Sequence, residues 1–199
     1  MKIIVIGATG TIGKAVAEAL APTHEVVRAA RRGPVRADIE DAASLSDLFA
    51  TMKDVDAVVS CAGSAVFKPL AKLSDADYEA SLRSKLMGQV TLLRVAVEHL
   101  KEGGSITLTS GVLAREPMPG SAAISMVNAA LEGFVAGASL ELPRRLRVNV
   151  VSPPWITETL AAMKMSVPGG ISAAACARAY VAAVERDFQG QTLDARKFA

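Results

Sequence analysis

The sequence feature that most constrains the fold is a glycine-rich segment, Gly7–Gly13, which follows an apolar run a few residues into the chain. The run 3–6 predicts a buried strand and residues 14–20 predict a helix, so the glycines form a strand-to-helix turn. Glycines let the backbone approach a ligand without a Cβ in the way, and the positive end of the helix then faces bound phosphates. The spacing G-x-x-G-x-x-G differs from the commonest dinucleotide fingerprint, so a tight turn without a ligand remains the alternative.

Strands and helices alternate along the rest of the chain. Further strands are predicted at residues 24–29, 35–39, 55–60, 106–109, 146–151 and 190–193, and helices at 40–51, 74–100, 121–142 and 172–187. This alternation predicts a parallel sheet with helices on both faces. We therefore expect an α/β protein with a Rossmann-like, doubly wound, three-layer fold and a single domain over residues 1–199.

The overall composition narrows the function classes. The formal net charge is only +2, which gives no reason to expect nucleic-acid or membrane binding. The apolar runs are shorter than the ~18 residues that span a bilayer, and the first residues read as a core strand rather than a signal peptide. Cys61 and Cys176 lack metal-ligand spacing and are expected to be reduced thiols, so we expect a cytoplasmic protein without a metal site.

Two arginines follow the second predicted strand. In a doubly wound fold, the residue after that strand meets the adenosine ribose, where an acid binds the 2′-hydroxyl and an arginine favours a 2′-phosphate. Here Ala30 is followed by Arg31 and Arg32, which favours NADP(H) over NAD(H). The alternative is a pair of solvated arginines in a turn.

At this point the chain resembles the short-chain dehydrogenase/reductase family over nearly its whole length. The segments that carry the resemblance are Gly7–Gly13, Cys61–Gly63, Ser110, Asn128–Phe134 and Val148–Pro153. The resemblance implies a set of cofactor-binding residues: Gly7, Thr9, Gly10, Thr11, Ile12 and Gly13 at the diphosphate, Arg31 and Arg32 at the ribose phosphate, Asp38 and Ile39 at the adenine, Cys61, Ala62 and Gly63 under the adenosine ribose, and Pro153 and Ile156 near the nicotinamide.

The family's catalytic pair is missing from this chain. The family uses Tyr-x-x-x-Lys on a long helix, where the lysine lowers the pKa of the tyrosine that moves the proton. The matching positions here are Ile124 and Asn128, whereas Lys85 stands where the family has an asparagine on the earlier long helix. Ser110 matches the family serine, one residue further from position 124 than usual. The resemblance thus implies that Ser110, Lys85 and Asn128 form the catalytic set, unless Lys85 is an ordinary solvated lysine.

Two functions remain open at this stage. One is an NADP(H)-dependent oxidoreductase with an altered proton relay and a small carbonyl or alcohol substrate, and the other is a non-catalytic NADP(H) sensor or scaffold. The retained Ser110 and the relocated Lys85 favour the enzyme, while the missing tyrosine favours the sensor. Because the two long helices pair across a two-fold axis in this family, we also expect a homodimer or homotetramer.

Overall fold

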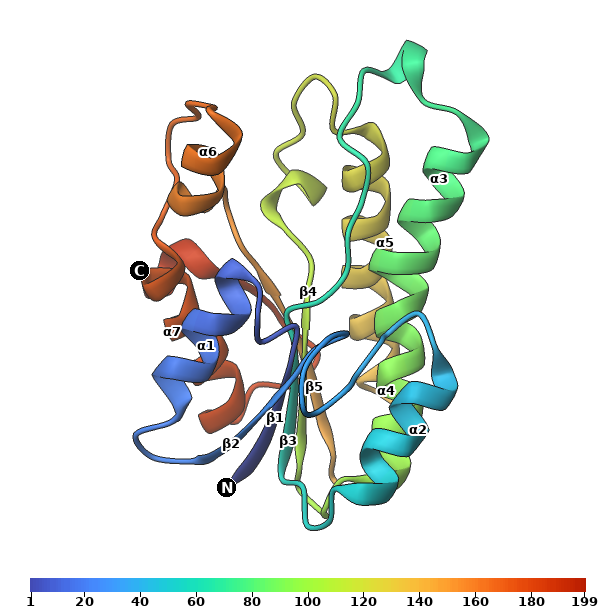
Figure 1. The fold of residues 1–199 in the computed structure, drawn as a ribbon, viewed down its shortest axis with the longest axis vertical. Helices are drawn as coiled ribbons and strands as arrows, with labels where there is room; N and C mark the ends of the chain where they lie inside the picture. The colour runs from blue at the N-terminus through green and yellow to red at the C-terminus, as the bar shows by residue number, and fades with distance from the viewer.

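The computed structural model describes residues 1–199 and shows one parallel sheet between two layers of helices (Figure 1). The strands are β1 (Lys2–Ile6), β2 (Glu25–Ala29), β3 (Ala57–Ser60), β4 (Ser105–Thr109), β5 (Arg147–Ser152) and β6 (Thr192–Asp194). Their order in the sheet is β2-β1-β3-β4-β5-β6, and every neighbouring pair is parallel. The predicted Rossmann-like architecture is confirmed.

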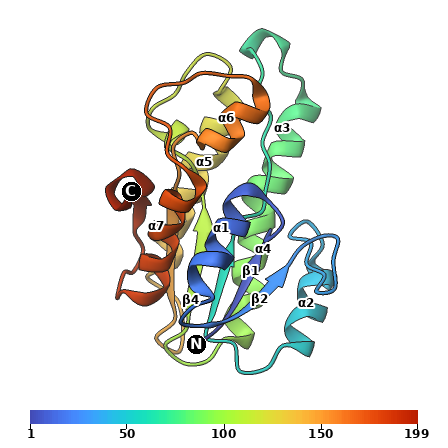
Figure 2. The same cartoon turned by 60° about the vertical axis from the view of Figure 1, so that its left-hand side comes forward.

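The helices divide between the two faces of the sheet. They are α1 (Thr11–Leu20), α2 (Ala42–Thr51), α3 (Asp75–Ser81), α4 (Gly88–His99), α5 (Ala122–Ala138), α6 (Thr157–Met163) and α7 (Ala173–Glu185). Helices α1 and α7 cover one face and α2, α4 and α5 cover the other (Figures 1 and 2). The predicted helix at 74–100 is confirmed, but a π-helical turn, Leu82–Met87, joins its two parts, α3 and α4.

The core explains why the first apolar run lacks polar alternation. Side chains of β1 alternate between the two faces, so Ile3 and Val5 pack towards α1 and α7 while Ile4 and Ile6 pack towards α2, α4 and α5. Because both faces are covered, all four side chains are fully or almost fully buried. β1 therefore fixes the glycine loop that follows it at the carboxyl edge of the sheet.

The predicted strand at 35–39 is wrong. Arg36 forms only an isolated bridge to Ala30, and the sheet ends at β2. A strand parallel to β2 needs a crossover of roughly a dozen residues, whereas a turn of a few residues separates β2 from this segment. The segment instead folds back beside the end of β2 and brings Asp38 and Ile39 to the carboxyl edge.

A short helix that the sequence did not predict, α6, follows β5. It lies beyond the carboxyl ends of the strands, on the side of α7, and ends at Lys164 in a left-handed conformation. A bridge between Ile156 and Ile171 closes the loop that contains it. Elsewhere, none of the helices combines the length and apolarity that a membrane span requires.

Candidate functional site

A cavity of about 670 Å³ lies at the carboxyl ends of β1, β2 and β3. It brings together ten of the predicted cofactor-binding residues: Gly7, Thr9, Gly10, Arg31, Arg32, Asp38, Ile39, Cys61, Ala62 and Gly63. Thr11, Ile12 and Gly13 form the adjoining first turn of α1, and Pro153 and Ile156 follow β5, outside this cavity. Sequence reasoning missed Glu40, Ser64 and Ser84, which also line the cavity.

Backbone contacts shape the floor of this cavity. Gly7 has a φ of +80°, and a Cβ there would lie 2.9 Å from the carbonyl carbon of Cys61. A Cβ at Gly13 would lie 2.1 Å from the carbonyl oxygen of Gly7. The first N–H groups of α1 have no partner within the helix, so they remain available to an anion. The glycine spacing thus allows an approach of the backbone to a ligand that any side chain would prevent.

The two arginines after β2 provide unpaired positive charge at one end of the cavity. Arg31 and Arg32 are exposed and take part in none of the ion pairs of the chain. The acid beside them, Glu40, is paired with Arg83 at 3.1 Å, and hydrogen bonds from Ser84 and Arg83 hold the pKa of that carboxyl below its usual value. The guanidinium groups are therefore free to bind a phosphate.

Lys85 lies on the π-helical turn beside this cavity, next to the lining residues Gly63 and Ser84, and is not itself part of the lining. A Cβ at Gly63 would lie 3.3 Å from both Cα and Cδ of Lys85, so the side chain runs along the loop after β3. The ammonium has no hydrogen bond or ion pair within the chain, and burial lowers its pKa from 10.5 to about 8. The nearby thiol of Cys61 opposes this shift only weakly, because burial raises the pKa of that thiol and keeps it neutral. Lys85 is therefore half-buried and desolvated in part, which distinguishes it from a fully exposed surface lysine.

Asn128 lies on α5 and is only 3% exposed. Its Oδ1 atom is buried without a hydrogen-bond partner. A Cβ at Gly111 would lie 2.9 Å from its Nδ2 atom, so this amide faces the backbone just after β4. One turn earlier on α5, the half-buried Ile124 offers no group that can move a proton. An unpartnered buried amide indicates that a ligand or water completes this part of the site.

Ser110 follows β4 and takes part in a polar network that the sequence did not predict. Its hydroxyl donates to Oε1 of Glu132 at 2.8 Å, and Glu132 pairs with Arg115 at 2.6 Å. Arg115 also donates to the hydroxyl of Ser152 at 3.1 Å. The signal for Glu132 was its place four residues after Asn128, on the same face of α5. The amide nitrogen of Asn128 faces Gly111, one position after Ser110.

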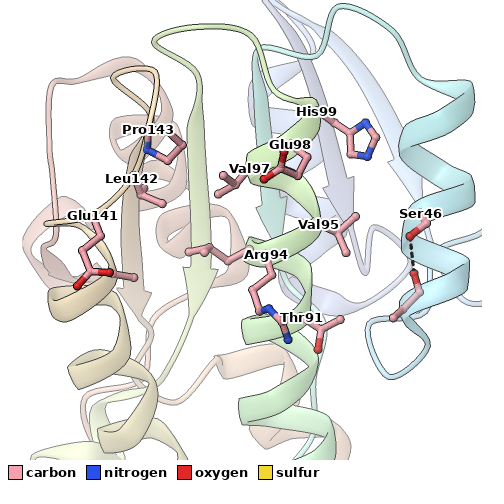
Figure 3. A pocket seen from close by; sticks show the side chains of 13 residues that line it. Ser46, Thr91, Arg94, Val95, Val97, Glu98, His99, Glu141, Leu142 and Pro143 are labelled. Carbon is pink, nitrogen blue, oxygen red and sulfur yellow. Dashed lines mark hydrogen bonds between the residues drawn. The ribbon is translucent and has the colours of Figure 1, made fainter.

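A second cavity, also about 670 Å³, lies between α2, α4 and α5 (Figure 3). Residues near the ends of α4 and α5 line it, at the end of the molecule opposite the glycine loop. Its lining includes Arg94, Glu98 and His99, and the ring of His99 stacks on Phe49 with centroids 5.4 Å apart. None of the predicted site residues contributes to it. The chemistry-bearing groups therefore gather at the carboxyl edge of the sheet and not in this groove.

Comparison with known proteins identifies relatives of this chain. A family model described as enoyl-(acyl carrier protein) reductase matches residues 5–186. A curated relative, the hydroxynaphthalene reductase-like protein Arp2 of Metarhizium brunneum, is 30% identical over 176 residues. That match covers 75% of this chain and 66% of the relative, so the chain spans slightly less than two thirds of the relative's length.

Two solved structures are similar over almost the whole chain. The protein lin1944 from Listeria innocua is 36% identical, with a TM-score of 0.93 and 98% of each chain covered. A small-chain dehydrogenase in complex with NADPH is 26% identical, with a TM-score of 0.86, and the match covers 100% of this chain and 98% of the other.

The environment of Lys85 predicts how stability depends on pH. Folding lowers the pKa of this lysine from 10.5 to about 8, so between these values the unfolded chain binds more protons than the folded chain. The free energy of unfolding should therefore rise from pH 8 to pH 10.5, by roughly 1–3 kcal/mol relative to Lys85→Met, which lacks this contribution. Urea unfolding across this range measures the difference. Lys72→Met, at an exposed lysine, is the control, and a Lys85→Met profile parallel to wild type would refute the prediction.

Proposed function

Because the chain belongs to the short-chain dehydrogenase/reductase family, we propose that it is an NADP(H)-dependent oxidoreductase that acts on a small carbonyl or alcohol substrate. The observation that carries this proposal is the cleft itself. It combines a glycine loop at a helix N-terminus with two unpaired guanidinium groups and, nearby, a lysine of lowered pKa. The NADPH complex of a structural neighbour supports the same choice of cofactor.

The residues present fit a nicotinamide dinucleotide phosphate. The Gly7 and Gly13 cradle, which a Cβ would fill, holds the diphosphate, and Arg31 with Arg32 holds the ribose phosphate. Asn128, whose amide oxygen has no partner within the chain, would add a polar group near the cofactor. When bound, this cofactor supplies or accepts a hydride. The protein must then supply the proton, because carbonyl reduction needs both.

Lys85 is the residue to which we assign the proton. With a pKa of about 8, the amine is mostly protonated at neutral pH and can donate to a carbonyl oxygen, directly or through water. Above pH 8 it is mostly neutral and can accept a proton from an alcohol. Reduction should therefore weaken as the pH rises through 8, while oxidation should strengthen.

Asn128 and Ser110 orient the substrate in this proposal. The amide of Asn128 has no competing hydrogen bond within the chain and can donate to the substrate oxygen or to the cofactor ribose. The Ser110 hydroxyl donates to Glu132, so it can contact a substrate only by exchanging that bond or by accepting with its oxygen. Glu132, paired with Arg115, remains an acceptor in either case.

The alternative function is a non-catalytic NADP(H) sensor or scaffold. The observation that favours it is the half-buried Ile124, which removes the tyrosine that the family uses as its proton donor. Both functions need the glycine cradle and the arginine pair. They differ only in whether Lys85 transfers a proton.

The proposed cofactor preference depends on the arginine pair. Replacing both Arg31 and Arg32 with alanine should weaken NADPH binding by about 1–3 kcal/mol, since charge-assisted hydrogen bonds to the phosphate are lost. NADH binding should change little. Fluorescence titration of both cofactors measures this, with Arg36→Ala, an exposed arginine outside the cavity, as the matched control. Equal affinity of the wild-type protein for NADPH and NADH would contradict the assignment.

The proposed assembly places α4 and α5 of two subunits against each other. Gly133 is exposed on α5 and a Cβ there meets nothing within 4 Å, so Gly133→Arg should leave the monomer folded while blocking the helix pairing. Light scattering at micromolar concentration should show an oligomer for wild type and a smaller species for this variant. Ala174→Arg, exposed on α7, is the control. A monomeric wild type would exclude this assembly.

The test that separates enzyme from sensor is Lys85→Met. Assayed on a panel of carbonyls and alcohols, the variant should lose turnover by roughly 10²–10⁴-fold, the usual contribution of a general acid. If Lys85 instead only binds the nicotinamide ribose, NADPH affinity should fall by about 1–2 kcal/mol. Lys72→Met should change neither quantity. NADPH binding by wild type without turnover across the panel would favour the sensor, and unchanged binding and turnover in Lys85→Met would remove this lysine from the mechanism.

A further inference from the structure

The buried side chain of Gln89 links Lys85 to the end of β4. Gln89 is 0% exposed, on the first turn of α4. Its Nε2 atom donates to the carbonyl oxygen of Lys85 at 3.0 Å and to that of Thr109 at 2.9 Å. Its Oε1 atom accepts from the backbone N–H of Thr109 at 2.8 Å. Both donor hydrogens and the oxygen of the amide are thus engaged by the backbone of two elements.

Thr109 has no pairing partner on β3, and the amide of Gln89 takes the place of that partner. The last residue of β4 that pairs with β3 is Thr107, whose partner is Val59. Two residues further, Thr109 has no β3 partner, so its peptide groups need another donor and acceptor. The primary amide of Gln89 provides both, as a neighbouring strand would. The end of β4, just before Ser110, is therefore tied to α4 by a side chain.

The same amide also donates to the π-helical turn. In a regular α-helix the carbonyl of Lys85 accepts from the backbone N–H of Gln89, four residues on. A π-helical turn shifts the backbone hydrogen bonds to a spacing of five residues and is uncommon, and such turns occur frequently at functional sites. Here the side chain of Gln89 donates to the Lys85 carbonyl. Gln89 thus ties the turn that carries Lys85 to the end of β4.

We propose that Gln89 is a positioning residue, which locks the π-helical turn to the end of β4 and thereby directs the Lys85 side chain along Gly63 towards the cofactor cleft. This inference rests on the role proposed above for Lys85. Gln89 is enclosed by helix and sheet and acts through the backbone of Lys85 and Thr109.

The charged surroundings of Lys85 make its titration a suitable reporter. The Cys61 thiol is the titratable group that acts on Lys85 from the neighbouring loop. On the same turn, Arg83 is already paired with Glu40. The pKa of Lys85 thus depends mainly on its burial, and a turn that loosens and lets the amine reach water should raise it towards 10.5.

The test measures reductive methylation of Lys85 as a function of pH, read by mass spectrometry in wild type and in Gln89→Met. Methionine has nearly the same length but makes none of the three hydrogen bonds. The midpoint of the Lys85 profile should move up by about one pH unit or more. NADPH affinity should fall severalfold. Leu100→Ala, which removes a buried side chain just beyond α4, should destabilise the fold without moving the midpoint.

A midpoint that is unchanged in Gln89→Met would overturn the inference, because loss of stability alone does not move it. If this variant does not fold, Gln89→Leu, which also lacks the three hydrogen bonds and adds no charge, takes its place, and the same upward shift is expected. Failure of both variants to fold would make Gln89 a residue of the fold only and would also overturn the inference. The midpoint is measured without cofactor, so failure of wild type to bind NADPH counts against the proposed function and leaves this test intact.

Discussion

The rest of the site depends on the contact between the glycine loop after β1 and the loop after β3. Gly7 has a left-handed backbone and no Cβ, so the backbone of Cys61 can lie against it. Gly13 also lacks a Cβ, so the start of α1 can lie against the carbonyl of Gly7. This approach sets the floor of the cleft and aims the first turn of α1 across it. Because both loops follow strands buried on both faces, the sheet itself fixes their positions.

The second constraint is electrostatic. The family has its lysine at the position on α5 where this chain has the amide of Asn128. The lysine of this chain, Lys85, lies instead on the π-helical turn before α4. The ammonium of the half-buried Lys85 has no partner within the chain, and its desolvation lowers its pKa. Beside the cleft, the π-helical turn that carries this lysine is bound by the fully buried Gln89, which donates to the carbonyl of Lys85.

Much of this fold could be predicted from the sequence because its signals are local. The apolar runs, the glycine turn and the alternation of elements located six strands and most helices, and the carboxyl edge followed from the parallel sheet. The prediction of a strand at 35–39 was wrong because it was based on residue types alone. The connection from β2 to this segment is too short for a parallel crossover. The helix α6 was missed because its seven residues are too few to show the apolar periodicity by which helices are predicted.

The polar contacts of the site were less predictable. The positions of Gly7, Arg31 and Gly63 after their strands predicted that they would line one cavity. In contrast, Ser110 and its partner Glu132, and Gln89 and its partner Thr109, are more than 15 residues apart in the sequence. Such pairs depend on the register of helix against sheet, which a single sequence does not specify. The π-helical turn is likewise a consequence of packing, because residues 82–87 carry no breaker within an otherwise helical pattern.

The most direct test of the central claim, that Lys85 has taken over the place of the missing tyrosine and lysine pair, is a crystal structure of the protein with NADP⁺ bound. The account predicts the diphosphate on the glycine loop, the ribose phosphate beside Arg31 and Arg32, and the Lys85 ammonium within about 3.5 Å of the nicotinamide ribose or of a water at the substrate position. A nicotinamide end turned away from Lys85, or a Lys85 side chain withdrawn into solvent, would contradict it.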